Sequence, residues 1–182
     1  VWAQENTRQS ILAALKRREV YATTGPRIAL RFFAGDGYSD DILHSESLYR
    51  EAVASGVPMG GVLAGGREVS PEFIVLAERD VTGANLDRIQ IVKGWVDEQG
   101  QTHERVHNIA WSGERVLDAS GRLPAVGDSV DHASASYRNN IGEPSLQARW
   151  QDPEFDPRQP AFYYVRVLQI PTPRHSLYDA IA

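Results

Sequence analysis

Apolar and polar residues alternate in several short runs along the chain after residue 26. In the first run, Ile28, Leu30 and Phe32 alternate with Ala29 and Arg31, which is the spacing of a strand with one buried face. Similar patterns, or short continuous apolar runs, predict further strands at 73–77, 88–96, 102–111, 135–138, 146–150 and 161–170. Helical spacing is limited to residues 6–19 and 40–55, so strands dominate the predicted fold.

The run 161–170 has the strongest strand pattern of the chain. One face carries Tyr163, Val165 and Val167, and the other carries Phe162, Tyr164 and Leu168. Strands that are apolar on both faces are typical of the centre of a sheet, so we expect a central strand here. The runs 88–96 and 102–111 flank a short polar turn and predict a hairpin.

The helical segment 6–19 is amphipathic. Asn6 is its candidate N-cap, and Ile11, Leu12 and Leu15 form an apolar stripe that a helix of this length must bury against something else. Gly25-Pro26 then ends the helical pattern. The chain opens on Val1 without a Met, and we interpret residues 1–25 as a terminal helix and junction from an upstream domain, with residues 26–182 as a separate domain.

Many strands, short connections and peripheral helices favour a mainly β protein. The predicted fold is an antiparallel β-sandwich with an N-terminal helix and one further short helix, and an immunoglobulin-like sandwich is one form that it can take. The βαβ alternation of a doubly wound parallel sheet is missing.

Composition excludes several function classes. The 182 residues contain no Cys, which removes disulfides, thiolate metal sites and Cys nucleophiles, and the formal net charge is −5. Basic residues are scattered rather than gathered in a stripe, so we expect no nucleic-acid partner. No apolar run is long enough to span a membrane. The compartment stays open, with export to a bacterial periplasm as one option.

One metal-binding motif occurs, His103-Glu104-Arg105-Val106-His107. On a helix, His103 and His107 would share a face and hold zinc, and Glu104 would activate the bound water. On a strand the same two residues lie about 13 Å apart, too far for one zinc. Because this segment has the pattern of a hairpin arm, we favour a chance match, and a zinc hydrolase is kept as an alternative.

Three other features have a structural explanation that we prefer. The acidic loop Asp36-Gly-Tyr-Ser-Asp40-Asp41 lacks the spacing of a calcium loop, and the pairs Gly60-Gly61 and Gly65-Gly66 match no phosphate-binding motif. Aromatic residues suited to a sugar-binding face are also common in sandwich cores; they are Trp95, Trp111, Trp150, Tyr163 and Tyr164.

The junction from Tyr21 to Arg27 is polar and turn-forming. Thr23 and Thr24 could bond backbone groups there, or Arg27 could reach an anionic ligand. The sequence leaves both interpretations open, and with them the question of whether this junction contributes to a site.

Several longer motifs resemble a bacterial family known only as a domain of unknown function. They are Glu5-Asn-Thr-Arg8, Ala14-Leu-Lys-Arg-Arg-Glu19, Tyr21-Ala-Thr-Thr-Gly-Pro-Arg27, Gly56-Val-Pro-Met-Gly-Gly61, Gly83-Ala-Asn-Leu-Asp-Arg-Ile-Gln-Ile-Val-Lys-Gly-Trp95 and Pro160-Ala-Phe-Tyr-Tyr-Val-Arg-Val-Leu168. Full-length members of that family look related to the PHP (polymerase and histidinol phosphatase) metallohydrolases. The resemblance implies an upstream domain that binds divalent metal through His and Asp ligands and hydrolyses phosphoesters. The chain contains no His-x-His motif, so no catalytic, metal or cofactor-binding residue is assigned within it.

We therefore expect a non-catalytic C-terminal sandwich of a PHP-related metal-dependent hydrolase. Its partner would be the upstream domain of the same chain, and an exposed docking face could also support a homodimer. The alternatives are the zinc hydrolase, and a carbohydrate- or partner-binding sandwich that uses exposed Trp residues.

Overall fold

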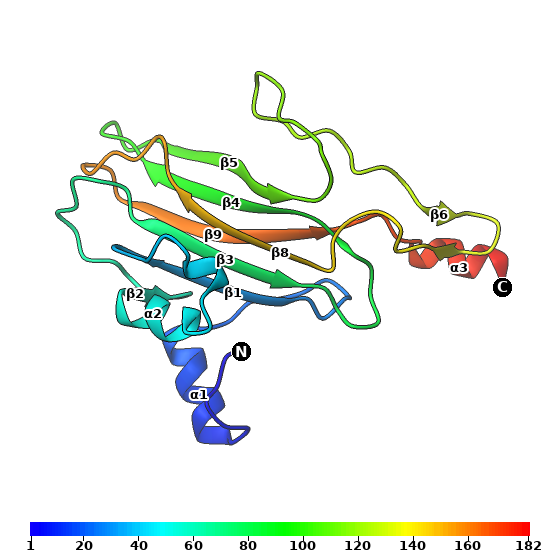
Figure 1. Ribbon diagram of the computed structural model, residues 1–182, viewed down its shortest axis with the longest axis horizontal. Coiled ribbons are helices and arrows are strands. Elements are labelled where there is room, and N and C mark those ends of the chain that lie inside the picture. Colours follow the sequence, from blue (N-terminus) through cyan, green and yellow to red (C-terminus); the bar gives the residue numbers. More distant parts are fainter.

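Two antiparallel sheets pack face to face in the computed structural model, which describes residues 1–182 (Figure 1). One sheet has the order β2-β1-β3-β8 and the other has the order β5-β4-β9. The first comprises β2 (Gly56–Pro58), β1 (Ala29–Gly35), β3 (Glu72–Glu78) and β8 (Ser145–Gln151). The second comprises β5 (Thr102–Trp111), β4 (Leu86–Val96) and β9 (Ala161–Gln169). The predicted mainly β, antiparallel sandwich is confirmed.

The remaining elements lie around the sandwich. They are α1 (Arg8–Arg17), η1 (Ile42–His44), α2 (Leu48–Ala54), the small hairpin of β6 (Val130–Asp131) with β7 (Ser136–Tyr137), and α3 (His175–Ile181). Figure 1 shows α1 below the sandwich, and α3 beside the β6–β7 hairpin at the far end of the molecule. No helix has both the length and the apolar character needed to cross a membrane.

The main core fills the space between the sheets. Leu30 of β1, Phe73 and Val75 of β3, and Ile89 and Ile91 of β4 are buried in one cluster. These residues recur at every second position, because alternate side chains of a strand point to the same face. Each fully buried Ile contributes about 1.5–3 kcal/mol of transfer free energy relative to an exposed one.

A second cluster covers the opposite face of the first sheet. Ile74 of β3 packs there with Phe33 of β1, Ile42 of η1 and both Leu48 and Ala52 of α2. This cluster explains the continuous apolar run of β3, whose two faces meet different cores. The strand predicted at 73–77 is thus confirmed, and β3 lies between β1 and β8.

The predicted central position of the last strand is wrong. β9 pairs only with β4 and forms the edge of its sheet. Its outward residues Phe162 and Tyr164 are exposed. Only the inward face of β9 therefore packs on the core, although both faces are apolar.

The helices are shorter than predicted. The N-cap of α1 is Thr7 rather than Asn6, because the Thr7 side chain accepts a hydrogen bond from the Ser10 backbone N–H. The segment 40–55 contains the short η1 and α2 rather than one helix, and α3 was not predicted.

Candidate functional site

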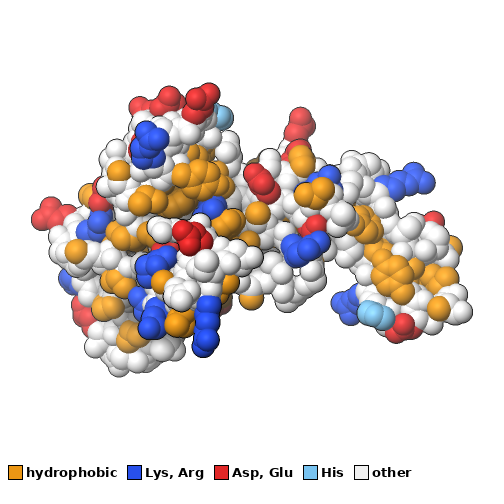
Figure 2. Space-filling model, turned by 90° about the horizontal axis from the view of Figure 1, so that it is seen from below, with side chains coloured by type: hydrophobic (Ala, Val, Ile, Leu, Met, Phe, Trp, Pro, Cys, Tyr) orange, Lys and Arg blue, Asp and Glu red, His pale blue; other side chains and the backbone are white.

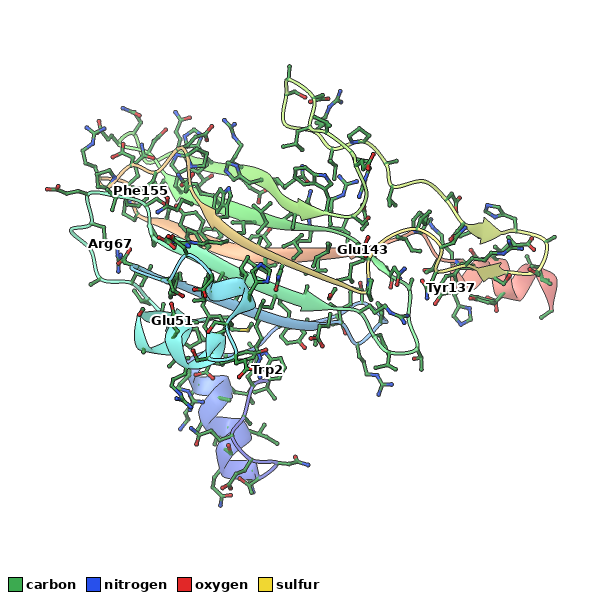
Figure 3. All side chains as sticks on the ribbon, in the orientation of Figure 1. Trp2, Glu51, Arg67, Tyr137, Glu143 and Phe155 are labelled. Atoms are coloured by element: carbon green, nitrogen blue, oxygen red, sulfur yellow. The ribbon has the colours of Figure 1, made fainter.

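An open apolar groove of about 1260 Å³ runs between β1 and β9. Its walls come from inward residues of these two strands and from the loops around them, and most of the lining side chains are hydrophobic. Arg67 and Phe155 line the groove from two different loops, and Figure 3 shows both at the same end of the sandwich. The groove is thus the side on which the two sheets are not closed over their common core.

β9 forms one rim of this groove, and its inward side chains are incompletely covered. Tyr163, Val165 and Val167 point inward and pack against the main core, yet each is only partly buried. The outer edge of β9 has no neighbouring strand, and no backbone or side-chain hydrogen bond reaches it. Apolar side chains and an unpaired strand edge therefore lie side by side.

The outward face of β9 carries an aromatic pair. The rings of Phe162 and Tyr164 are nearly parallel, at an interplanar angle of 13° and a centroid distance of 6.4 Å. The Phe162 ring covers Gly94 of β4, where an added Cβ would lie 2.3 Å from the ring. Gly94 therefore leaves room for an aromatic side chain on the neighbouring strand.

The opposite rim differs, because the free edge of β1 is protected. The Trp2 indole N–H donates to the Leu30 carbonyl oxygen at 2.8 Å, and the Arg31 guanidinium lies 3.1 Å from the centre of the Trp2 ring. Farther along β1, Phe33 to Gly35 pair with β2. The N-terminal segment thus occupies the position where another strand could pair with β1.

The junction from Tyr21 to Arg27 lies at the groove. Tyr21, Thr23 and Thr24 are among the lining residues. The Arg27 backbone N–H donates to Oδ2 of Asp80 at 2.8 Å, and this hydrogen bond holds the pKa of Asp80 below its ordinary value. The Arg27 side chain is mostly exposed, so the junction contributes its residues to a groove wall rather than to an anion site already formed by neighbours.

A buried polar cluster lies at the phenol end of Tyr163. Oδ2 of Asp152 accepts from Nζ of Lys93 at 2.5 Å and from the Tyr163 hydroxyl at 2.7 Å. Nζ of Lys93 also donates to the Glu154 carbonyl oxygen at 2.7 Å. Because Tyr163 also lines the groove, this cluster connects the groove wall to the interior of the sandwich.

Burial and hydrogen bonding act in opposite directions on this cluster. Burial raises the pKa of Asp152, but the hydrogen bonds from Lys93 and Tyr163 outweigh it and hold the pKa below its ordinary value. Burial, together with the bond to Asp152, raises the pKa of Tyr163. The carboxylate is therefore charged and the phenol neutral at physiological pH, which suits a structural ion pair.

The helix that the zinc motif requires does not form here. His103 and His107 lie on strand β5 with separate partners. Nε2 of His103 is 2.6 Å from Oδ2 of Asp97, whereas the ring of His107 packs on Trp150 at a centroid distance of 4.9 Å. No group of three or more His, Asp or Glu side chains is arranged to hold a metal ion.

A family model described as "Protein of unknown function (DUF3604)" matches residues 1–182. The chain belongs to this family. No curated protein and no solved structure matches it. The family fits the predicted resemblance to a domain of unknown function.

The other sequence features of the DUF3604 chain have structural partners. In the acidic loop, Asp36 pairs with Arg67, and Asp40 lies 3.6 Å from Arg149. Gly60 packs against the carbonyl oxygen of Arg18, the C-cap of α1. The four Trp residues are all at least partly buried, and they are Trp2, Trp95, Trp111 and Trp150.

The sequence missed the groove and the exposed aromatic pair. Both depend on β9 being an edge strand, and apolar residues on both faces of a strand give no sign of that position. The buried ion pair left a partial signal: Lys93 interrupts the inward series that starts with Ile89 and Ile91, and a charge at such a position needs a buried partner.

Proposed function

We propose that this chain is a non-catalytic sandwich domain of a larger, PHP-related metal-dependent hydrolase. In that protein, α1 packs on a metal-binding domain, and residues 1–25 form the connection between the two domains. The metal and its His and Asp ligands belong to that other domain. The sandwich holds this metal-binding domain in place beside the groove.

The observation that carries this proposal is the exposed apolar face of α1. Leu12 and Leu15 are 49% and 51% exposed, only Ala14 of the helix is buried, and the residues that flank the helix hold it to the sandwich. Nε of Arg18 donates to the Gly60 carbonyl oxygen at 3.1 Å, and Trp2 bonds to β1. A helix held in this way has no need of exposed Leu side chains for its own fold, so these residues support a second packing partner.

The surface on the α1 side is consistent with such a partner. Figure 2 views the molecule from below, the side on which α1 lies, and shows apolar side chains interspersed with basic and acidic ones. The last turn of α1 contributes Lys16 and Arg17. Contacts between domains of one chain are more polar than obligate interfaces, so a surface of mixed apolar and charged side chains suits such a contact.

The test replaces both leucines in the complete gene product. We expect Leu12→Asp with Leu15→Asp to separate the domains, seen as faster proteolysis between them and as two unfolding transitions where the parent shows one. The matched control is Val81→Asp, at an exposed valine in the turn between β3 and β4. If the double variant behaves like this control, α1 is not the contact surface and the proposal fails.

A second candidate, carbohydrate binding, rests on the pair of Phe162 and Tyr164. Two exposed and nearly parallel rings can stack on the apolar face of a sugar ring. Titration of residues 1–182 with soluble glucans, followed by tyrosine fluorescence, should then give a response that Phe162→Ala removes. An unchanged spectrum at saturating glucan would end this candidate.

A further inference from the structure

Both the groove and the edge of β9 lack a partner. The inward side chains Tyr163, Val165 and Val167 are only partly covered, and the outer backbone edge of the same strand has no partner. An added strand would supply both side chains for the groove and hydrogen bonds for the edge. A small apolar molecule could fill the groove, but it would leave the N–H and C=O groups of β9 unpaired.

Only one of the two rims can take such a strand. On β1, Trp2 occupies the carbonyl oxygen of Leu30, and β2 pairs with Phe33 to Gly35. The edge of β9 is less protected, since the strand contains no Pro, no side chain bonds to its backbone, and Arg166 is its one charged residue. Of the two rims of the groove, β9 is therefore the one with an open edge.

We propose that the groove accepts an extended segment of another polypeptide chain as an added strand along β9. Apolar residues at every second position of this segment enter the groove beside Val165 and Val167. The main chain extends the sheet β5-β4-β9 by one strand. This binding site goes beyond the docking of α1, which uses a different surface of the sandwich.

The geometry also limits the chemistry of the added segment. β9 has 9 residues, so a partner of similar length spans about 30 Å. On the outward face, Nε of Arg166 donates to Oε1 of Gln90 at 2.9 Å, and Arg166 has no carboxylate partner. The segment should therefore carry an acidic residue among its outward positions, opposite or diagonal to Arg166.

A second copy of this chain fits the groove less well. Pairing of β9 with β9 of another copy would satisfy the open edge. However, Tyr163, Val165 and Val167 of each copy already pack in that copy's own core, so each groove would stay unfilled. An extended segment without a core of its own has its apolar side chains free to enter.

The test uses two synthetic probes of nine residues with blocked ends. Val or Leu alternates with Thr and Glu, so that the apolar positions fall on one face. We expect saturable binding to residues 1–182 and slower amide hydrogen exchange at alternate residues of β9. N-methylation of the probe on the edge that faces β9 keeps its apolar side chains but removes the backbone donors, and we expect it to weaken binding about tenfold or more.

A protein variant separates the groove from the rest of the surface. Val165→Glu should abolish probe binding, whereas Val81→Glu, at an exposed valine that does not line the groove, should leave it unchanged. If Val165→Glu fails to fold, the methylated probe still decides the matter with the parent chain.

Three outcomes would overturn the proposal. The methylated and unmethylated probes could bind equally well, or neither could bind. Tetradecanoate could bind the groove and displace the probe while β9 exchange stays fast, which would make the groove a site for apolar anions. Sedimentation could show a dimer whose β9 amides are already protected and that the probe does not disrupt, which would make a second copy the occupant.

Discussion

Nζ of Lys93 lies 2.5 Å from Oδ2 of Asp152, and the two side chains are 3% and 0% exposed. The same carboxylate oxygen accepts the Tyr163 hydroxyl. A single carboxylate thus joins β4, the turn after β8 and β9. Since Tyr163 also lines the groove, this ion pair fixes one end of the groove wall.

Breaking the ion pair from one side should be strongly destabilising. Lys93→Met leaves the Asp152 carboxylate buried without its cation, which costs about 3–5 kcal/mol of unfolding free energy. Replacing both partners, with Lys93→Met and Asp152→Asn, should recover much of this loss because no charge is then buried alone. Urea unfolding of the parent, both single variants and the double variant measures the coupling. Additive losses would show that the two groups do not interact.

The same pair should give a pH dependence whose sign reverses on mutation. In the parent, the pKa of Asp152 is below its ordinary value, so its contribution is present above the unfolded pKa of about 3.9 and is lost as pH falls through the folded pKa. In Lys93→Met, burial dominates and raises the pKa of Asp152.

Relative to the double variant, which has no carboxylate here, Lys93→Met should therefore gain stability as pH falls from 7 to 5, because its folded state then binds the proton more readily than the unfolded state. The measurement is the urea midpoint of both proteins at several pH values. A variant that loses as much stability in this window as the control below would contradict the assignment. Asp152→Asn with Lys93→Met is the control, since it has no carboxylate at this position.

Local sequence patterns predicted where the strands are better than they predicted which strands lie side by side. The predicted arm 102–111 has the same bounds as β5 (Thr102–Trp111), because alternation and the preceding turn are both local signals. The same kind of pattern at 161–170 predicted β9 but not its edge position. That position depends on which distant strand pairs with β9, and an apolar outward face, with Phe162 lying over Gly94, resembles a buried one in sequence.

Prediction of the candidate site from the sequence was limited even more by non-local contacts. Gly25-Pro26 marked the junction correctly as a break between a helix and a strand, yet its place on the groove wall required the position of β9. Trp2 gave no signal at all, because its role is to bond to Leu30, 28 residues away. The motif of His103 and His107 gave a false signal that only the strand assignment could weaken.

The attachment of α1 should depend on one glycine. Gly60 has φ +82°, and an added Cβ would lie 2.3 Å from the Arg18 carbonyl oxygen. Gly66 is a matched control, since it also has φ +82° but no atom lies within 4 Å of the added Cβ. Both Gly→Ala changes should cost about 1–3 kcal/mol for the left-handed backbone, but only Gly60→Ala should also displace α1.

Hydrogen exchange of residues 8–17 measures this displacement directly. We expect faster exchange there in Gly60→Ala than in Gly66→Ala, at equal distance from the unfolding midpoint. Equal exchange in the two variants would mean that the contact with Arg18 does not hold the helix.

His107 should make the protein less stable in mild acid. Burial lowers the pKa of this imidazole; the nearby acids Asp152 and Glu154 oppose the shift, whereas Arg105 and Lys93 reinforce it. The folded state therefore favours neutral His107, and the unfolded state, with a pKa of about 6.5, binds the proton first as pH falls. The unfolding free energy should drop as pH falls from about 7 through 6.5 toward the folded pKa.

His107→Phe keeps an aromatic ring against Trp150 and removes the titrating group, so its unfolding free energy should be flatter over this range. His175→Asn, on the exposed α3, is the control and should follow the parent. Urea unfolding at pH 7.5, 6.5 and 5.5 compares the three proteins. If His107→Phe loses as much stability as the parent between these pH values, the acid sensitivity comes from another group and His107 is not held in the neutral form.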